Sequence, residues 1–183
     1  MVITHARLSG LHLRALIVDD AESMRVLLCR LLKRIGIATA EFADGSAALS
    51  SVMSMAPDFI LSDLSMAPMD GLTFTRSLRG MKDPKVRQTP IILITGYTER
   101  SRLEAARDAG ISAILAKPVT ATTVYVRIEE VVLRPRPFVT APTYSGPCRR
   151  RVCTIDYAGP FRRSSDPSVK AAAERVQAPS PSS

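Results

Sequence analysis

Five polar residues stand at or directly after the ends of short apolar runs, and their side chains could together handle a phosphoryl group. They are Asp19, Asp20, Asp63, Thr95 and Lys117. Three carboxylates gathered in one place repel one another, so a hard divalent cation such as Mg²⁺, which keeps waters for phosphate oxygens, is their natural partner. A carboxylate beside that ion can attack phosphorus and form an acyl phosphate. A lysine supplies a mobile positive charge, and a threonine hydroxyl supplies a hydrogen bond.

Each of these residues alone has an ordinary structural explanation. An acidic pair after a strand is often a helix cap, and a lone Asp there is commonly a cap or turn residue. Thr95 alone is typical of a strand end, and Lys117 alone is typical of a solvated loop. The case for a site therefore depends on all five residues occurring together, in this order, at strand ends.

The elements that must position these residues can be predicted from patterns of hydrophobicity before residue 134. Short apolar runs alternate five times with segments whose apolar residues recur at helical spacing. Strands are predicted at 13–18, 37–42, 59–62, 91–95 and 111–116, and helices at 24–35, 46–55, 72–79, 99–109 and 120–133. Asp44 and Thr98 are suited to cap the second and fourth helices, and Gly36 and Gly110 to end the first and fourth.

Five βα units in about 120 residues predict an α/β fold with a parallel sheet and right-handed crossovers. The flavodoxin-like (βα)5 arrangement, with strand order 2-1-3-4-5, is the commonest five-stranded solution. Its ligand crevice lies at the carboxyl ends of strands 1 and 3, where the strand order reverses. We therefore expect the five polar residues to meet at this edge of the sheet.

These segments resemble the receiver domains of bacterial response regulators, which share the fold of chemotaxis response regulators. The matching stretches are 16–20 (Leu-Ile-Val-Asp-Asp), 63–71 (Asp-Leu-Ser-Met-Ala-Pro-Met-Asp-Gly), 91–96 (Ile-Ile-Leu-Ile-Thr-Gly) and 116–118 (Ala-Lys-Pro). The resemblance covers about residues 13–133, and every functional position is filled. It implies that Asp63 accepts phosphate from a histidine kinase or phosphotransfer protein.

The resemblance also implies a metal site. Asp20, Asp63 and the backbone carbonyl of Ser65 would ligate Mg²⁺, and Asp19 would assist through water.

The remaining implied roles concern switching. Thr95 would move towards the phosphoryl group, and Lys117 would pair with it, before a cis peptide bond to Pro118. The surface formed by residues 98–133 would then shift between two arrangements and bind an output protein whose identity the sequence does not give.

The chain departs from the family's usual pattern at three positions. Ala67 stands four residues after the predicted acceptor, where the family usually has proline, and Pro68 comes one residue later. Ile114 stands three residues before the lysine, where the family has its switch aromatic. Tyr97, two residues after Thr95, has two interpretations: a gate or partner contact, and an ordinary half-exposed loop residue.

The net charge of +8 belongs mainly to the C-terminal part of the chain. Residues 134–183 carry 9 Lys or Arg against 3 Asp or Glu and 8 of the 13 prolines, whereas residues 1–133 carry 16 against 14. Composition thus divides the chain into an N-terminal extension (1–12), a receiver domain (13–133) and a basic tail rich in Pro, Arg and Ser (134–183). We expect this tail to be flexible and largely irregular.

The tail contains the motif Tyr-x-Gly-Pro-x-Arg-Arg twice, beginning at Tyr144 and at Tyr157. A solvated tail is the plain interpretation. The alternative is a docking segment for an acidic surface, membrane phospholipid or nucleic acid, in which Tyr stacks on bases and Arg contacts phosphates. Cys148 and Cys153 lie in the same stretch, where neighbouring arginines favour the thiolate and so make oxidation conceivable.

Composition also predicts the cellular location of the protein. The sequence contains no run of 18 apolar residues that would indicate a membrane span, and its first residues lack a secretory pattern. Three cysteines are too few for a disulfide framework. A reducing cytoplasm is the simplest location.

The favoured function is a single-domain response regulator in phosphorelay signal transduction. The alternative is a nucleic-acid-binding regulator that acts through the basic tail. A phosphatase of the aspartyl-phosphate type would share the nucleophile and Mg²⁺, but it generally needs a second acid two residues later, where Ser65 stands. We therefore predict a phosphoacceptor switch with slow self-dephosphorylation, not an enzyme. A degenerate receiver is not favoured, because no acidic or lysine position is missing.

Overall fold

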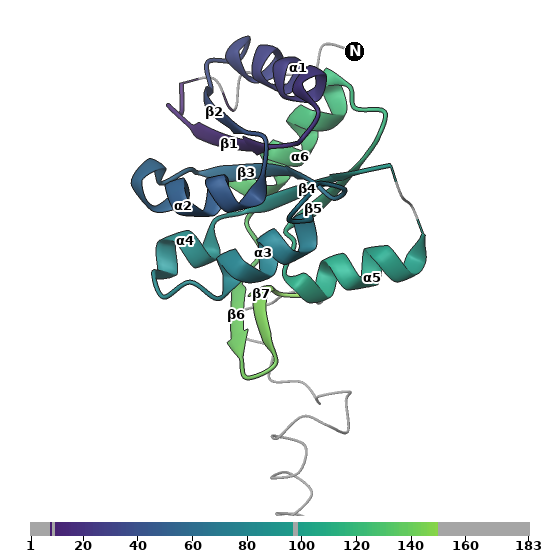
Figure 1. Ribbon diagram of the computed structural model, residues 1–183. Helices are drawn as coiled ribbons and strands as arrows, with labels where there is room; N and C mark the ends of the chain where they lie inside the picture. Colours follow the sequence, from purple (N-terminus) through teal and green to yellow (C-terminus); the bar gives the residue numbers. More distant parts are fainter. Residues whose placement is uncertain (1–7, 9, 97–98, 150–183) are drawn as a thin grey trace, which may run out of the picture. The chain divides into compact units, whose positions relative to one another are not determined.

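The computed structural model describes residues 8, 10–96 and 99–149 of this chain. Five parallel strands form one sheet in the order β2-β1-β3-β4-β5 (Figure 1). The strands are β1 (Arg14–Val18), β2 (Ala38–Phe42), β3 (Phe59–Asp63), β4 (Ile91–Thr95) and β5 (Ala113–Ala116). This arrangement confirms the predicted flavodoxin-like fold and its strand order.

Helices cover both faces of the sheet (Figure 1). They are α1 (Glu22–Lys33), α2 (Gly45–Met55), α3 (Gly71–Arg79), α4 (Pro84–Gln88), α5 (Arg100–Ala109) and α6 (Ala121–Leu133). Leu28 of α1 and Ile128 of α6 pack in the core on one face, and Val52 of α2 and Phe74 of α3 pack in the core on the other. Because both faces are covered, β3 and β4 are buried along their whole length.

The short helix α4 is absent from the predicted elements. Pro84 stands at its beginning, and the Asp83 side chain accepts a hydrogen bond of 2.8 Å from the Lys85 amide. Five residues are too few to show a helical period, so this helix depends on its cap and on the burial of Val86.

The ends of the other helices largely follow the expected capping residues. Asp44 caps α2 by accepting hydrogen bonds from two backbone amides, and Gly110 ends α5 in the left-handed region. The N-cap of α5 is Glu99, which makes no side-chain cap hydrogen bond. The predicted cap, Thr98, lies outside the described residues.

The first part of the predicted flexible tail is an antiparallel hairpin. Strands β6 (Phe138–Ala141) and β7 (Tyr144–Pro147) pair with each other below α3 and α5 in Figure 1. The prediction of an irregular segment is therefore wrong for these residues. The paired strands also contact α5, and these contacts between distant parts of the chain accompany the pairing. The second repeat lies outside the described residues.

Two further sequence expectations concern membranes and cysteines. Within the part of the chain that the structure describes, no helix is long and apolar enough to cross a membrane. Cys29 is free and buried, whereas Cys148 is disulfide-bonded. Cys153 lies outside the described residues.

Candidate functional site

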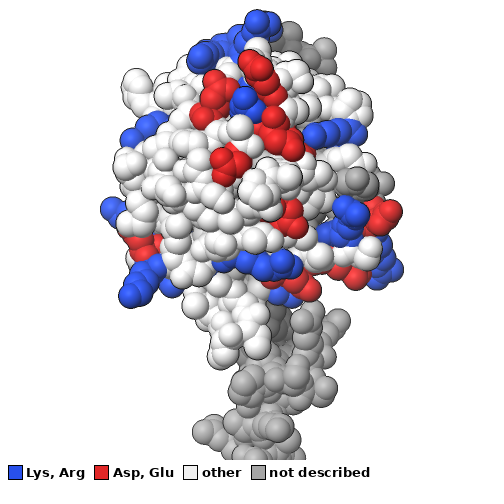
Figure 2. Space-filling model, in the orientation of Figure 1, with Lys and Arg blue, Asp and Glu red and all other residues white. Residues whose placement is uncertain are grey.

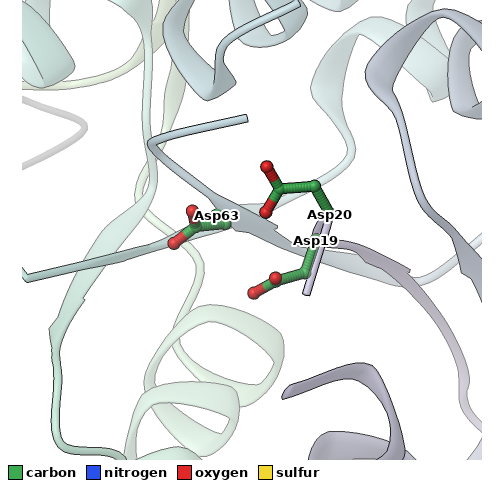
Figure 3. A group of neighbouring side chains, drawn as sticks. All are labelled: Asp19, Asp20 and Asp63. Carbon is green, nitrogen blue, oxygen red and sulfur yellow. The ribbon is translucent and has the colours of Figure 1, made fainter. Parts of the chain in front are cut away.

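Three carboxylates converge at one edge of the sheet. Asp19 and Asp20 directly follow β1, and Asp63 is the last residue of β3, the neighbouring parallel strand. The carboxyl ends of neighbouring parallel strands share one edge, so these side chains meet. One oxygen from each lies within 4.8 Å of the others, and Figure 3 shows the three groups pointing into a common space.

Asp19 is the most buried of the three and carries an unsatisfied oxygen. Its side chain accepts a 2.9 Å hydrogen bond from the Ala21 amide at Oδ1, while Oδ2 is buried without a hydrogen-bond partner. Burial raises the pKa of Asp19, and the charges of Asp63 and Asp20 raise it further, against the lowering effect of the Ala21 hydrogen bond. Holding the ionised Asp19 carboxylate here thus costs the folded state free energy, and a bound cation would offset that cost.

Asp63 is held at both carboxylate oxygens. Oδ1 lies 2.7 Å from Nζ of Lys117, and Oδ2 accepts a 3.0 Å hydrogen bond from the Ser65 amide. The Asp63 side chain is 5% exposed, and that of Lys117 is 31% exposed. This pair therefore joins the end of β3 to the residue after β5, and its lysine remains open to solvent.

The loop between β3 and α3 passes very close to the backbone of Asp63. A Cβ added to Gly71 would collide with the Asp63 carbonyl oxygen and would lie 2.9 Å from Leu93 Cδ1. Glycine at position 71 therefore permits this tight return of the chain. The Ala67–Pro68 peptide in the same loop is cis, at the position where the sequence departs from the usual family pattern.

The remaining predicted site residues lie along β4 and after β5. Thr95 is buried at the end of β4, in register with Ala116 of β5. The Lys117 amide donates a 2.8 Å hydrogen bond to the Thr95 carbonyl, and the Lys117–Pro118 peptide is cis. Tyr97 lies outside the described residues.

Ile114, at the family's switch-aromatic position, is partly buried among apolar residues on the α3 side of the sheet.

Arg25, which is not among the site residues predicted from the sequence, supports the backbone of the acidic pair. Its Nη1 donates hydrogen bonds of 2.8 Å to the Asp19 carbonyl and 3.2 Å to the Asp20 carbonyl, and Nε lies 3.7 Å from Glu41. In Figure 2 acidic side chains gather around a basic one over this part of the molecule. The feature of the sequence that could have indicated this role is an arginine in the helix that begins directly after two aspartates.

A cavity of about 390 Å³ lies beside this site. Ser65 and Asp70 from the β3–α3 loop line one side, and Ser101 and Arg102 from the first turns of α5 line the other. The cavity therefore lies between the beginning of α5 and the loop that follows Asp63.

Comparison with known proteins identifies the class to which this fold and site belong. Residues 15–129 match the family model described as the response regulator receiver domain. The match covers more than half of the chain, so the protein belongs to the family of response regulator receiver domains.

Several chemotaxis proteins are similar to this chain. The chemotaxis protein CheY of Pseudomonas aeruginosa is 32% identical over 123 residues, which cover 67% of this chain and 98% of that protein. CheY-3 of Vibrio cholerae is 30% identical over 124 residues, 67% of this chain and 94% of that protein.

Two solved structures are similar in both fold and sequence. CheY4 of Vibrio cholerae superposes with a TM-score of 0.62 at 28% identity, covering 65% of this chain and 98% of that one. The receiver domain of a sensor histidine kinase from Pseudomonas aeruginosa PAO1, solved with a magnesium ion coordinated in its active-site cleft, gives 0.60 at 26% identity, covering 66% and 97%.

Proposed function

We propose that this protein is a single-domain response regulator in which Asp63 accepts a phosphoryl group from a histidine kinase or phosphotransfer protein. The observation that carries the proposal is the setting of Asp63. Its buried carboxylate lies between the Lys117 ammonium group and the Ser65 amide, and two further carboxylates face it across the sheet edge. Membership of the receiver family supports the same role.

The residues at this edge fit Mg²⁺. The buried Asp19 Oδ2 has no hydrogen-bond partner, and the three carboxylates offer oxygen ligands of the kind that a hard cation prefers. In this proposal Asp20, Asp63 and the Ser65 carbonyl hold the ion, and Asp19 assists through water. When bound, Mg²⁺ neutralises charge on the transferred phosphoryl oxygens.

The transfer itself is a displacement at phosphorus. A carboxylate oxygen of Asp63 attacks the phosphorus of a phosphohistidine, and the P–N bond breaks as the new P–O bond forms. The electron pair left on the imidazole nitrogen takes up a proton from solvent. Lys117 then pairs with the new phosphoryl oxygens, and the Thr95 hydroxyl donates a hydrogen bond to them. Slow attack of water on the same phosphorus returns Asp63 and orthophosphate.

The phosphoryl group then acts as a switch. It adds negative charge beside Thr95, at the end of β4 from which the chain leads to α5. The surface formed by α5, β5 and α6 shifts and changes its affinity for an output protein. A cytoplasmic location, shared with the phosphodonor protein, is part of this proposal.

The test is to incubate the protein with Mg²⁺ and acetyl phosphate and to weigh it by intact-protein mass spectrometry. We expect wild type to gain the mass of one phosphoryl group and Asp63→Asn to gain none. The matched control is Asp58→Asn, an exposed aspartate before the same strand, which is expected to be phosphorylated like wild type. Equal labelling of the Asp63 variant and the control would exclude Asp63 as the acceptor.

The alternative function, nucleic-acid binding through the basic tail, depends mostly on residues 150–183, which lie outside the described residues. It stays a prediction. Binding of generic RNA or DNA that weakens steeply with added salt would favour it, because phosphate contacts release counterions.

A further inference from the structure

The β6–β7 hairpin contacts the C-terminal end of α5 backbone to backbone. A Cβ added to Gly146 would lie 2.6 Å from the Cα of Gly110, and one added to Gly110 would lie 2.5 Å from the Ser145 carbonyl oxygen. Real Cβ atoms do not approach other atoms so closely, so this contact requires glycine on both sides. Gly110 is also the C-cap of α5, with φ of 91°.

Side chains extend the contact to both sides of these glycines. Arg149 Nη1 lies 2.6 Å from Asp108 Oδ1 in the last turn of α5. The Ser145 hydroxyl lies 3.3 Å from the Arg79 carbonyl at the end of α3. The Arg79 guanidinium lies 5.5 Å from the centroid of the Phe138 ring. The hairpin is thus tied to the ends of two helices.

The first Tyr-x-Gly-Pro-x-Arg-Arg motif supplies most of these contacts. Gly146 and Pro147 are buried, the Tyr144 hydroxyl donates a 2.6 Å hydrogen bond to the Pro147 carbonyl, and the Arg149 guanidinium lies 3.8 Å from the Tyr144 ring centroid. Each shared position of the motif that the structure describes therefore has a role in the hairpin's shape or docking.

The sequence of the second repeat lacks two of the docking residues. Ala158 stands where the first repeat has Ser145, and Arg151 stands where Phe138 precedes the first repeat. An arginine facing the Arg79 charge at the end of α3 would be repelled, so this docking surface suits the first repeat.

The helix α5 connects this docked end to the candidate site. Its first turns line the cavity beside Ser65, so that end of the helix borders open space. Its last turn is held by the hairpin. A helix of 10 residues moves as a rigid rod of about 15 Å, so a shift at the open end disturbs the close contact between Gly110 and Gly146.

From this geometry we infer that the β6–β7 hairpin is an autoinhibitory clamp on α5. The docked hairpin holds α5 in the position that the helix has when Asp63 is unphosphorylated. Phosphorylation of Asp63 and docking of the hairpin therefore oppose each other. The inference rests on the proposed function, because it requires a phosphoryl group at Asp63. Linkage makes the effect reciprocal, so releasing the hairpin favours the phosphorylated arrangement by the same factor as phosphorylation favours release.

The first experiment measures the affinity of the full-length protein for beryllofluoride with Mg²⁺, a stable mimic of the phosphoryl group. Gly146→Ala places a methyl group against Gly110 and releases the hairpin. We expect it to bind beryllofluoride at least about 5-fold more tightly than wild type, as is usual for coupled sites. Gly80→Ala is the matched control, because its added Cβ would meet neighbours no closer than 3.5 Å, and its affinity should equal that of wild type.

A charge swap tests the same clamp without altering a glycine. Asp108→Arg opposes Arg149 and should tighten beryllofluoride binding about 2-fold, since exposed ion pairs are weak. Adding Arg149→Asp restores the pair with reversed charges and should return the affinity towards the wild-type value, short of it by the lost contact between Arg149 and the Tyr144 ring. In wild type, beryllofluoride should also speed amide hydrogen exchange in residues 138–147 several-fold.

The outcomes separate the two proposals. If wild type binds beryllofluoride but neither Gly146→Ala nor Asp108→Arg binds it more tightly, the clamp is excluded and the phosphoacceptor role stands. Unchanged hydrogen exchange in the hairpin on binding also excludes the clamp. If wild type binds no beryllofluoride, the proposed function fails, and the clamp fails with it.

Discussion

At the scale of single residues, Asp19 shows how burial and like charges set the pH dependence of this protein. Burial raises its pKa in the folded chain above the ordinary value of 3.8. The folded state therefore binds this proton more tightly than the unfolded state does. The resulting stabilisation is fully present below the ordinary pKa and is lost as pH rises through the raised, folded-state pKa. At neutral pH the metal-free protein bears the whole cost of the buried charge.

We therefore expect Asp19→Asn to stabilise the Mg²⁺-free protein at pH 7. The amide keeps an oxygen for the Ala21 hydrogen bond and removes the buried charge, which should raise the free energy of unfolding by about 1 kcal/mol. Below pH 3.8, where Asp19 is protonated in both states, this gain should disappear. Urea unfolding at the two pH values measures it, with Asp58→Asn as the control. A variant less stable than wild type at pH 7 would contradict this account.

At the scale of elements, Arg79 joins the end of α3 to its neighbours. It is 4% exposed. Its Nε donates a 3.0 Å hydrogen bond to the Gly110 carbonyl, and Nη1 donates bonds of 2.6 Å and 2.9 Å to the carbonyls of Arg87 and Thr89. Burial lowers the pKa of Arg79 to about 10, so the side chain stays charged at neutral pH. One buried cation thus satisfies three carbonyl groups between α3, α4 and α5.

Replacing Arg79 should therefore be costly. We expect Arg79→Met to lower the free energy of unfolding by about 3 kcal/mol, because it leaves buried carbonyl groups without donors. The control is Arg76→Met, an exposed arginine on the same helix, which should change stability by less than about 0.5 kcal/mol. Chemical denaturation of the two variants measures the difference. Equal losses in the free energy of unfolding would show that the buried hydrogen bonds of Arg79 contribute little.

At the scale of the whole molecule, the acidic edge makes folding stability depend on a divalent cation. Three carboxylates repel one another in the folded chain but separate in the unfolded chain, where they bind Mg²⁺ weakly. We expect Mg²⁺ at about 100 times its Kd to raise the free energy of unfolding by about 2.7 kcal/mol. Thermal unfolding with Mg²⁺ and with EDTA measures this gain. Equal unfolding temperatures with Mg²⁺ and with EDTA would exclude a cation site that forms only in the folded chain.

The sequence predicted the fold because its signals are local. Apolar runs such as residues 91–95 predict a strand that is buried on both faces, and all five residues of β4 are buried in the structure. Five alternations of strand and helix leave few topologies, and right-handed crossovers place the carboxyl ends of the strands on one side. The meeting of Asp19, Asp20 and Asp63 follows from that topology.

Other features were not visible in the sequence because their causes are non-local. Arg79 lies on the buried face of α3 with Phe74, Thr75 and Leu78, and its hydrogen-bond partners come from other elements. The hairpin at Phe138–Pro147 was expected to be irregular because its composition is that of a tail.

What the sequence alone determined is therefore the order of the elements and the types of residues at the sheet edge, since hydrophobic period and turn chemistry act over a few residues. The tertiary structure decided which groups touch: Lys117 on Asp63, Gly71 against the Asp63 backbone, and Gly146 against Gly110. The reason is physical. Contacts between residues distant in the chain depend on how packed layers bring backbones together, and no local pattern encodes a separation of a few ångströms.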